Sequence, residues 1–140
     1  MQFPIAMDHA IRILHYLHSH KDLATAQDIS VAIEISYQNF SKISIQLRKN
    51  GLIGSVQGRH GGFFLTKPIN EISLYDIFFA LEGEMAIHHS LDFDKNDMPH
   101  ALPFYAFRPY FECVQKLLID KLSSQSVADF SASILQQMRA

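Results

Sequence analysis

Residues 36–67 read SYQNFSKISIQLRKNGLIGSVQGRHGGFFLTK, and this stretch decides the fold. Its first part carries apolar residues at spacings of three and four (Phe40, Ile43 and Leu47), which predicts a helix with that face buried. The serine that opens the stretch is a favourable N-cap. Gly51 ends the helix, because glycine adopts the left-handed backbone conformation at no steric cost.

A β-hairpin is predicted directly after this helix. Two short apolar segments, 52–56 and 63–66, flank a glycine-rich turn at 57–62. Short strands separated by such a turn are typical of a hairpin. The glycines also allow the main chain to approach a phosphate backbone closely. We expect this hairpin to form a wing beside the helix.

A second short helix is predicted before the first. Thr25 to Asp28 has the form of a capping box, with Asp in place of the usual Glu, so a helix begins near Ala26. Two helices joined by a short turn, the second of them basic, make a helix-turn-helix. A helix-turn-helix followed by a basic, glycine-tipped wing is an arrangement that reads duplex DNA.

Two more helices flank this unit. Apolar spacing predicts a helix over 5–19, and Ser73 to Asp76 is a second capping box that opens a helix ending at Gly83. Aspartates and prolines crowd the segment 84–103, which we expect to be irregular.

A long helix follows the irregular segment. It starts at Phe104 or at Pro109, since proline is favourable at the first helical position. Ser126 to Asp129 is a third capping box and opens a last helix.

The expected fold is mainly α-helical with one small β-hairpin. We predict a winged helix-turn-helix domain over 1–83, the irregular loop over 84–103, and a dimerisation helix with a closing helix over 104–140.

Composition agrees with a globular regulator. The chain has 140 residues, 48% of them hydrophobic and 19% charged, which suits one domain or one domain with an oligomerising arm. Charges interrupt every apolar run, so no segment is expected to span a bilayer. The N-terminus lacks the basic start and apolar stretch of a signal peptide. The single cysteine, Cys113, cannot form an internal disulfide, and a cytoplasmic location is expected.

Positive charge is concentrated in one part of the chain. Residues 1–36 hold two basic and four acidic side chains, residues 37–67 hold five basic and none acidic, and residues 68–140 hold five basic and ten acidic. Attraction to a polyanion depends on the local face rather than on the net charge of −2. A solvated basic face is the plainer interpretation, but the complete absence of acids over 37–67 favours nucleic acid.

An apolar stripe runs along the long C-terminal helix. Its members are Phe107, Phe111, Val114, Leu118 and Leu122. A small winged helix has limited capacity to bury such a stripe, so we expect it to form a homodimer interface. Packing against the chain's own core is the alternative. A two-fold dimer would also suit DNA with paired half-sites.

Three motifs then occur in order: LRKNGLI at 47–53, SVQGRHGGF at 55–63, and ISLYDIFFALEG at 72–83. Together they resemble the Rrf2 family of bacterial winged-helix transcriptional regulators, and the resemblance extends to SVADF at 126–130. It implies a homodimer that binds a palindromic operator in double-stranded DNA, usually as a repressor, with the long helix crossing its counterpart.

The resemblance also implies which residues contact DNA. They are Ser36, Tyr37, Gln38, Ser41, Lys42, Arg48, Arg59 and His60. Backbone N–H groups at the start of the recognition helix favour phosphate. Gln38 can pair with adenine in the major groove, and Arg59 can reach a groove edge or a phosphate.

Two departures from the family pattern stand out. Many members carry basic residues near the start of the first helix, where this chain has Ala6-Met7-Asp8, and Asp8 would repel a phosphate. Family sensors often hold an iron–sulfur cluster through three cysteines in the loop after the Glu-Gly motif. The loop at 87–93 has no cysteine, and one thiolate cannot hold a cluster, so no cofactor is expected.

Other side chains raise the alternative of a metal site in this region. They are His88, His89, His100, Asp92, Asp94 and Asp97. Adjacent histidines usually point different ways, so a polar, solvent-exposed loop is favoured and no metal is predicted. Cys113 lies on an apolar stripe, where a small core residue is favoured over a redox-sensitive thiol.

Two other classes of function were weighed. A winged helix that acts by binding another protein stays open, because the basic start is missing and the C-terminal half is acidic. An enzyme is not supported, since we find no nucleophile–base pairing, phosphate loop or convincing metal triad.

Overall fold

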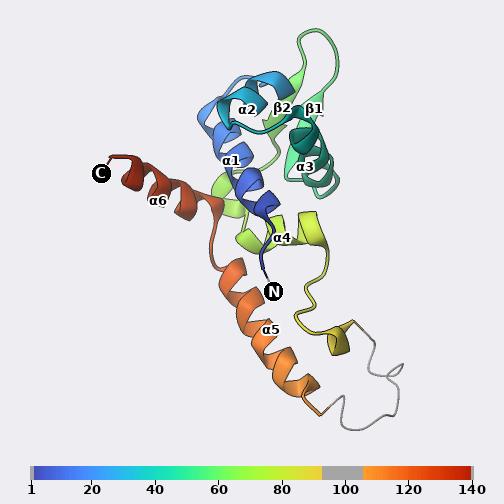
Figure 1. Ribbon diagram of the computed structural model, residues 1–140. Coiled ribbons are helices and arrows are strands. Elements are labelled where there is room, and N and C mark those ends of the chain that lie inside the picture. Colours follow the sequence, from blue (N-terminus) through green and yellow to red (C-terminus); the bar gives the residue numbers. More distant parts are fainter. Residues whose placement is uncertain (1, 93–105, 140) are drawn as a thin grey trace.

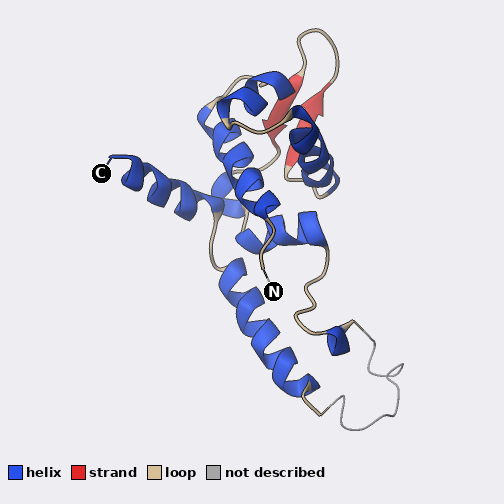
Figure 2. Ribbon diagram, in the orientation of Figure 1, coloured by secondary structure: helices blue, strands red, loops and turns tan. Residues whose placement is uncertain are grey.

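The computed structural model describes residues 2–92 and 106–139. Within these ranges lie six α-helices, one two-stranded antiparallel sheet and two short 3-10 helices (Figures 1 and 2). The elements are α1 (Ile5–Ser19), α2 (Ala26–Ala32), α3 (Tyr37–Lys49), β1 (Ile53–Val56), β2 (Gly62–Leu65), η1 (Ile69–Glu71), α4 (Leu74–Glu82), η2 (His89–Leu91), α5 (Arg108–Ser123) and α6 (Val127–Arg139). The predicted mainly helical fold with a small hairpin is confirmed.

Side-chain caps determine where four of these helices begin. In three capping boxes the N-cap hydroxyl accepts a hydrogen bond from the third backbone N–H, and the third side chain accepts one from the N-cap N–H. The pairs are Thr25–Asp28, Ser73–Asp76 and Ser126–Asp129. Ser36 caps α3 by accepting from the backbone N–H of Asn39 at 3.1 Å. All four starts agree with the sequence patterns.

The core lies where α1, α2, α3 and α4 meet. Each helix contributes the face that its apolar spacing predicts, and burying that face stabilises the helices, which are too short to persist alone. The largest fully buried side chains on these helices are Ile13, Leu14, Ile29, Phe40, Leu47 and Ile77. The helix-turn-helix is thereby fixed on α1.

The wing is a short hairpin whose base packs on the core, with Ile53 buried and Phe63 and Leu65 packed against the core. β1 pairs with β2 from Ile53↔Leu65 to Val56↔Gly62, and Phe63 exchanges backbone hydrogen bonds with Ala24. A Cβ at Gly62 would lie 2.8 Å from the carbonyl oxygen of Ala24, so this close approach requires glycine. The hairpin is therefore anchored beside the start of α2.

The two C-terminal helices lie differently on the rest of the molecule. α5 begins at Arg108 with Pro109 in its first turn, as the proline predicts, whereas Phe104 lies outside the described residues. No residue of α5 is fully buried, and Figure 1 shows this helix projecting away from the helix-turn-helix. The start of α6 returns to the core, where Val127 is fully buried.

The described part of the irregular loop folds onto α5. The ring of His88 stacks on the ring of Phe111, with centroids 4.1 Å apart, and the backbone N–H of Ile87 donates to Gln115 Oε1 at 3.1 Å. Arg108 donates to the carbonyl oxygen of Ser90, which is fully buried. This segment is thus packed and hydrogen-bonded rather than a solvent-exposed loop. None of the described helices is both long and apolar enough to cross a membrane.

Candidate nucleic-acid interface

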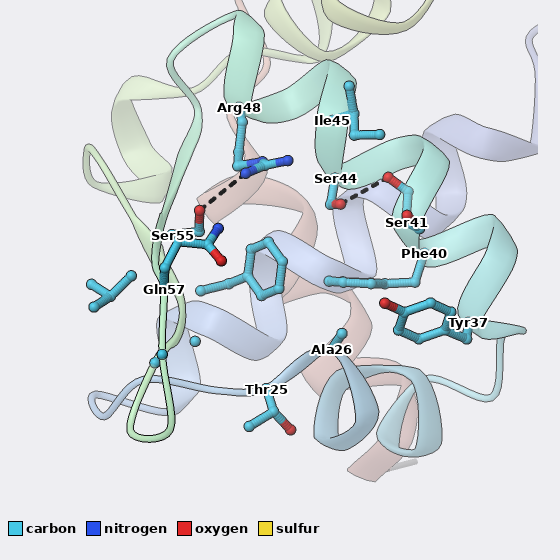
Figure 3. Close-up of a pocket in the computed structure, with 15 residues that line it drawn as sticks. Thr25, Ala26, Tyr37, Phe40, Ser41, Ser44, Ile45, Arg48, Ser55 and Gln57 are labelled. Atoms are coloured by element: carbon cyan, nitrogen blue, oxygen red, sulfur yellow. Dashed lines mark hydrogen bonds between the residues drawn. The ribbon is translucent and has the colours of Figure 1, made fainter.

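A groove of about 360 Å³ separates α3 from the wing (Figure 3). The helix side is lined mainly by Tyr37, Ser41, Ser44, Ile45 and Arg48, and the wing side by Ser55, Val56 and Gln57. Most side chains of both walls are polar, several of them are short, and that of Arg48 is cationic. A groove between a recognition helix and a wing is open to an extended polyanion rather than closed around a small ligand.

Two aromatic rings form the floor of this groove. Phe40 is buried on α3, and its ring meets that of Phe63 edge to face, with centroids 5.1 Å apart. Such aromatic pairs contribute about 0.5–1.5 kcal/mol beyond their buried area. The contact holds α3 and β2 at a fixed separation.

Arg48 connects the helix to the wing at the opposite end of α3. Its guanidinium donates to the hydroxyl of Ser55 at 3.1 Å and lies 6.0 Å from the ring centroid of Phe63 (Figure 3). A guanidinium has five N–H donors, so donors remain available after this bond. Arg48 therefore both positions the wing and keeps positive charge at the groove.

Of the predicted residues at α3, the groove is lined by Tyr37, Ser41 and Arg48 and not by Ser36, Gln38 and Lys42. Ser36, Tyr37, Gln38 and Lys42 are exposed and Ser41 is half-buried. Tyr37 is 63% exposed, which leaves its ring available to a partner.

The two predicted wing residues lie at the tip of the hairpin, away from the lining of the groove. The backbone N–H of Gly61 donates to the carbonyl oxygen of Gly58 at 3.0 Å, which closes a turn with Arg59 and His60 at its centre. Both side chains are exposed. A Cβ at Gly61 would lie 2.0 Å from the carbonyl oxygen of Val56, so the turn cannot close in this way without glycine.

Lys42 occupies a different position from the other predicted residues. It does not line the groove beside the wing but borders a second cavity, between α1, α3 and α4. It is exposed, so its ammonium group can still reach a phosphate on the outer side of α3.

Ile45 is a surface residue that sequence reasoning missed. It lies one helical turn after Ser41, lines the groove and is 41% exposed. An apolar side chain at this place can contact a thymine methyl group. Its spacing of four from Ser41 would have identified it, but the sequence analysis considered only the polar and charged side chains of this helix as DNA contacts.

The acid-free stretch keeps its positive character in the folded protein. None of its cations appears in an ion pair within the described residues, and the nearest acid in sequence, Glu34, lies in the turn before α3. Asp8, which the sequence suggested would repel a phosphate, lies 3.9 Å from the guanidinium of Arg12. This neighbour partly offsets the charge of Asp8.

The predicted dimer stripe divides into two faces on α5. Phe111, Val114, Leu118 and Leu122 are half-buried, and Leu122 packs against the core. Phe107, just before the helix, is 64% exposed, and Tyr110 and Leu117 are 66% and 65% exposed. The sequence analysis did not predict Tyr110 and Leu117, because the predicted stripe follows the adjacent face of α5. Cys113 is also exposed, not a core residue as the sequence suggested.

The donor side chains do not fit a metal cluster. Across residues 2–92 and 106–139, no three His, Cys, Asp or Glu side chains come together in a way that could hold a metal ion. Asp94, Asp97 and His100 lie outside the described residues. A single thiolate, on α5, is too few for a cysteine-ligated cluster anywhere in the chain.

Sequence comparison places these features among known regulators. A model of the Rrf2 family, described as an iron-dependent transcriptional regulator, matches residues 5–133. The chain is 31% identical over 91 residues to the HTH-type transcriptional regulator NsrR of Oceanobacillus iheyensis, covering 64% of this chain but only 62% of that protein. It is 29% identical over 123 residues to protein aau3 of Rhizobium meliloti, covering 82% and 80%.

Solved structures show the same architecture. CymR, the global cysteine regulator of B. subtilis, superposes with a TM-score of 0.70 at 18% identity, covering 95% of this chain and 98% of that one. IscR of T. potens superposes with a TM-score of 0.69 at 24% identity, covering 96% and 88%. At these identities the likeness establishes the fold. The family's description mentions iron, but residues 2–92 and 106–139 contain no group of three His, Cys, Asp or Glu side chains that could bind a metal ion.

Proposed function

Because this chain belongs to the Rrf2 family of transcriptional regulators, we propose that it binds double-stranded DNA in a sequence-specific manner and regulates transcription in the cytoplasm. One observation carries the proposal. The helix-turn-helix and wing carry five cationic side chains and no acid between residues 37 and 67, and four of these cations are exposed. Duplex DNA is the partner that such a face fits best.

The recognition helix α3 enters the major groove in this proposal. Its N-terminal residues Tyr37, Gln38 and Ser41 face the base edges, and Gln38 pairs with adenine through its amide. Ile45 contacts thymine methyl groups one turn later. Lys42 pairs with a phosphate beside the groove and supplies affinity rather than sequence selectivity.

The wing contacts the neighbouring part of the duplex. Arg59 and His60 at its tip reach a minor-groove edge or a phosphate, and Gly58 and Gly61 allow the backbone to come close. Arg48 holds the wing at its angle to α3, through the 3.1 Å bond to Ser55. Both elements then contact DNA as one rigid unit.

A homodimer built on α5 completes the proposal. Phe107, Tyr110 and Leu117 are exposed by 64–66%, and a helix with no fully buried residue gains most from a partner. Together with the predicted stripe they would pack against the same helix of a second copy. A two-fold dimer reads a palindromic operator. A dimer that occupies an operator within a promoter acts as a repressor.

A second candidate is a winged-helix module that works through a partner protein and binds DNA only weakly. The acidic character of residues 68–140 and the absence of a basic start to α1 favour it. Tyr37 and Ile45, both exposed, would then be protein contacts rather than DNA contacts.

A selection from random duplexes tests the proposal. The purified chain is incubated with a duplex library, bound DNA is recovered and amplified, and the enriched sequences are aligned. We expect a two-fold symmetric motif whose half-sites lie about one helical turn, or a multiple of it, apart. Enrichment of an asymmetric motif would contradict the dimer, and no enrichment at all would favour the partner-binding module.

A further inference from the structure

A second cavity, again of about 360 Å³, lies on the far side of α3 from the wing groove. Three helices line it: α1 with His9, α3 with Lys42 and Gln46, and α4 with Leu81 and Glu82. Volumes of this size are typical of sites for small molecules. The cavity is therefore large enough to hold a metabolite-sized ligand beside the recognition helix.

One polar atom at this cavity has no partner. The Nδ1 atom of His9 is buried and makes no hydrogen bond to any described residue. Folded proteins rarely leave a buried polar atom unsatisfied. Because this atom is buried, it does not face the open space, and the contacts to a ligand come from the other side chains of the lining.

Two opposite charges border the same space. Lys42 extends from α3 and Glu82 ends α4, and no ion pair joins either of them to another described residue. Gln46 donates to the carbonyl oxygen of Leu81 at 3.1 Å, which holds the two helices together across the cavity. The charged groups thus come from helices with a fixed separation.

The rest of the lining is apolar. Ile5 and Ala6 on α1, Ile43 on α3 and Leu81 on α4 contribute aliphatic surface. A ligand that matches this cavity carries one negative group, one positive group and a hydrocarbon part. Free α-amino acids with aliphatic side chains have this combination in one small molecule.

We propose that the cavity between α1, α3 and α4 binds a free aliphatic α-amino acid. The carboxylate pairs with Lys42, and the ammonium group pairs with Glu82. The side chain lies on Ile43 and Leu81. Ion pairs with both ends distinguish a free amino acid from a residue within a peptide.

Lys42 couples this site to DNA, a step that rests on the proposed function. The same ammonium group cannot pair fully with a ligand carboxylate and with a DNA phosphate. The amino acid therefore lowers DNA affinity, and DNA lowers amino-acid affinity by the same factor, as linkage requires. The chain becomes a regulator that releases its operator when the amino acid is abundant.

Thermal unfolding tests the binding site without DNA. The full chain is heated with L-leucine at increasing concentration, in parallel with leucinamide, which lacks the carboxylate, and N-acetyl-leucine, which lacks the ammonium group. We expect Tm to rise with the logarithm of leucine concentration and to change little with either analogue. An equal rise with all three compounds, or none with leucine, valine or isoleucine, would overturn the proposal.

A matched pair of variants locates the site. Glu82→Gln removes the proposed ammonium partner, and Glu84→Gln removes an equally exposed carboxylate two residues away that does not line the cavity. Leucine is expected to raise the Tm of Glu84→Gln as in the wild type, but not that of Glu82→Gln. A full response of Glu82→Gln would exclude this cavity.

Fluorescence anisotropy with a selected duplex tests the coupling. Saturating leucine is expected to weaken binding and to reduce the slope of log affinity against log salt by about one for each protomer on the duplex, because each protomer loses one phosphate contact. The DNA affinity of Glu82→Gln is expected to equal that of the wild type and not to change when leucine is added. Leucine that stabilises the protein but leaves DNA affinity unchanged would overturn the coupling alone. A chain that binds no DNA would refute the proposed function while the thermal result stands.

Discussion

The guanidinium of Arg48 donates a hydrogen bond to the hydroxyl of Ser55 at 3.1 Å, which joins the last turn of α3 to the first strand of the wing. The recognition helix and the hairpin are contiguous in sequence, and this contact and the Phe40–Phe63 pair help to define the angle between them. The geometry of the proposed DNA-binding surface therefore depends on a side chain that the sequence predicted only as a DNA contact.

Ser55→Ala separates the positioning role of Arg48 from its charge. We expect DNA affinity to fall several-fold, because the wing loses its fixed angle, while the free energy of unfolding changes by no more than about 1 kcal/mol. Anisotropy and urea unfolding measure the two quantities. If Arg48→Ala weakens binding and Ser55→Ala does not, Arg48 acts on DNA directly and the contact with Ser55 is incidental.

Gly61→Ala is expected to disable the wing without unfolding the domain. The new Cβ would lie 2.0 Å from the carbonyl oxygen of Val56, so the turn that carries Arg59 and His60 must open. The tip of the hairpin is exposed and lies outside the core, so we expect a cooperative unfolding transition close to that of the wild type. DNA affinity should fall to the level of Arg59→Ala combined with His60→Ala. Binding at wild-type strength would show that the turn is not part of the interface.

Leu117→Asp tests the proposed homodimer. Leu117 is 65% exposed in the single chain, so the substitution removes little internal packing, but it places a charge in the interface on α5. We expect monomers in sedimentation velocity. Val31→Asp on α2 is the matched control, since Val31 is 68% exposed and lies far from α5 in sequence. Dimers in both variants would contradict an interface at this face.

His15 makes the docking of α6 sensitive to pH. Its Nδ1 atom lies 2.8 Å from the hydroxyl of Ser131 on α6, and burial, followed by the nearby His18, lowers the pKa of His15 from 6.5. Below pH 6.5 the unfolded chain takes up a proton that the folded chain resists, so stability falls until the pH drops below the folded pKa. Above pH 6.5 this contribution is absent.

Urea unfolding at pH 8 and at pH 5.5 measures this effect. His15→Gln should reduce the loss of stability between the two values, whereas His20→Gln, at an exposed position near the end of α1, should retain it. Equal losses in the wild type and in His15→Gln would show that other groups control the acid response.

The local parts of this fold were predictable from sequence. Capping boxes, the glycine after α3 and the spacing of Phe40, Ile43 and Leu47 act over a few residues, so each helix start and the hairpin follow from short patterns. Pro109 likewise indicated where α5 begins. These features also located the helix-turn-helix and the wing.

The long-range contacts were not predictable in this way. The bond from His15 to Ser131 spans 116 positions, and the cavity at His9 combines three helices whose packing no local pattern specifies. The orientation of α5 is another case, because the spacing of its apolar residues fits two adjacent faces. Tyr110 and Leu117 were therefore missed, while Leu122 packs on the core.

The most direct test of the DNA-binding surface is the salt dependence of duplex binding, measured by fluorescence anisotropy on a selected duplex. The Lys42→Ala/Arg59→Ala variant is compared with Lys121→Ala/Arg139→Ala, which removes two exposed cations from α5 and α6. We predict that the first variant binds more weakly. If both of its lost cations contact phosphates, its slope of log affinity against log salt falls by about two for each protomer on the duplex, while the control keeps the wild-type slope. Identical affinity and slope in the wild type and both variants would contradict a DNA interface on α3 and the wing.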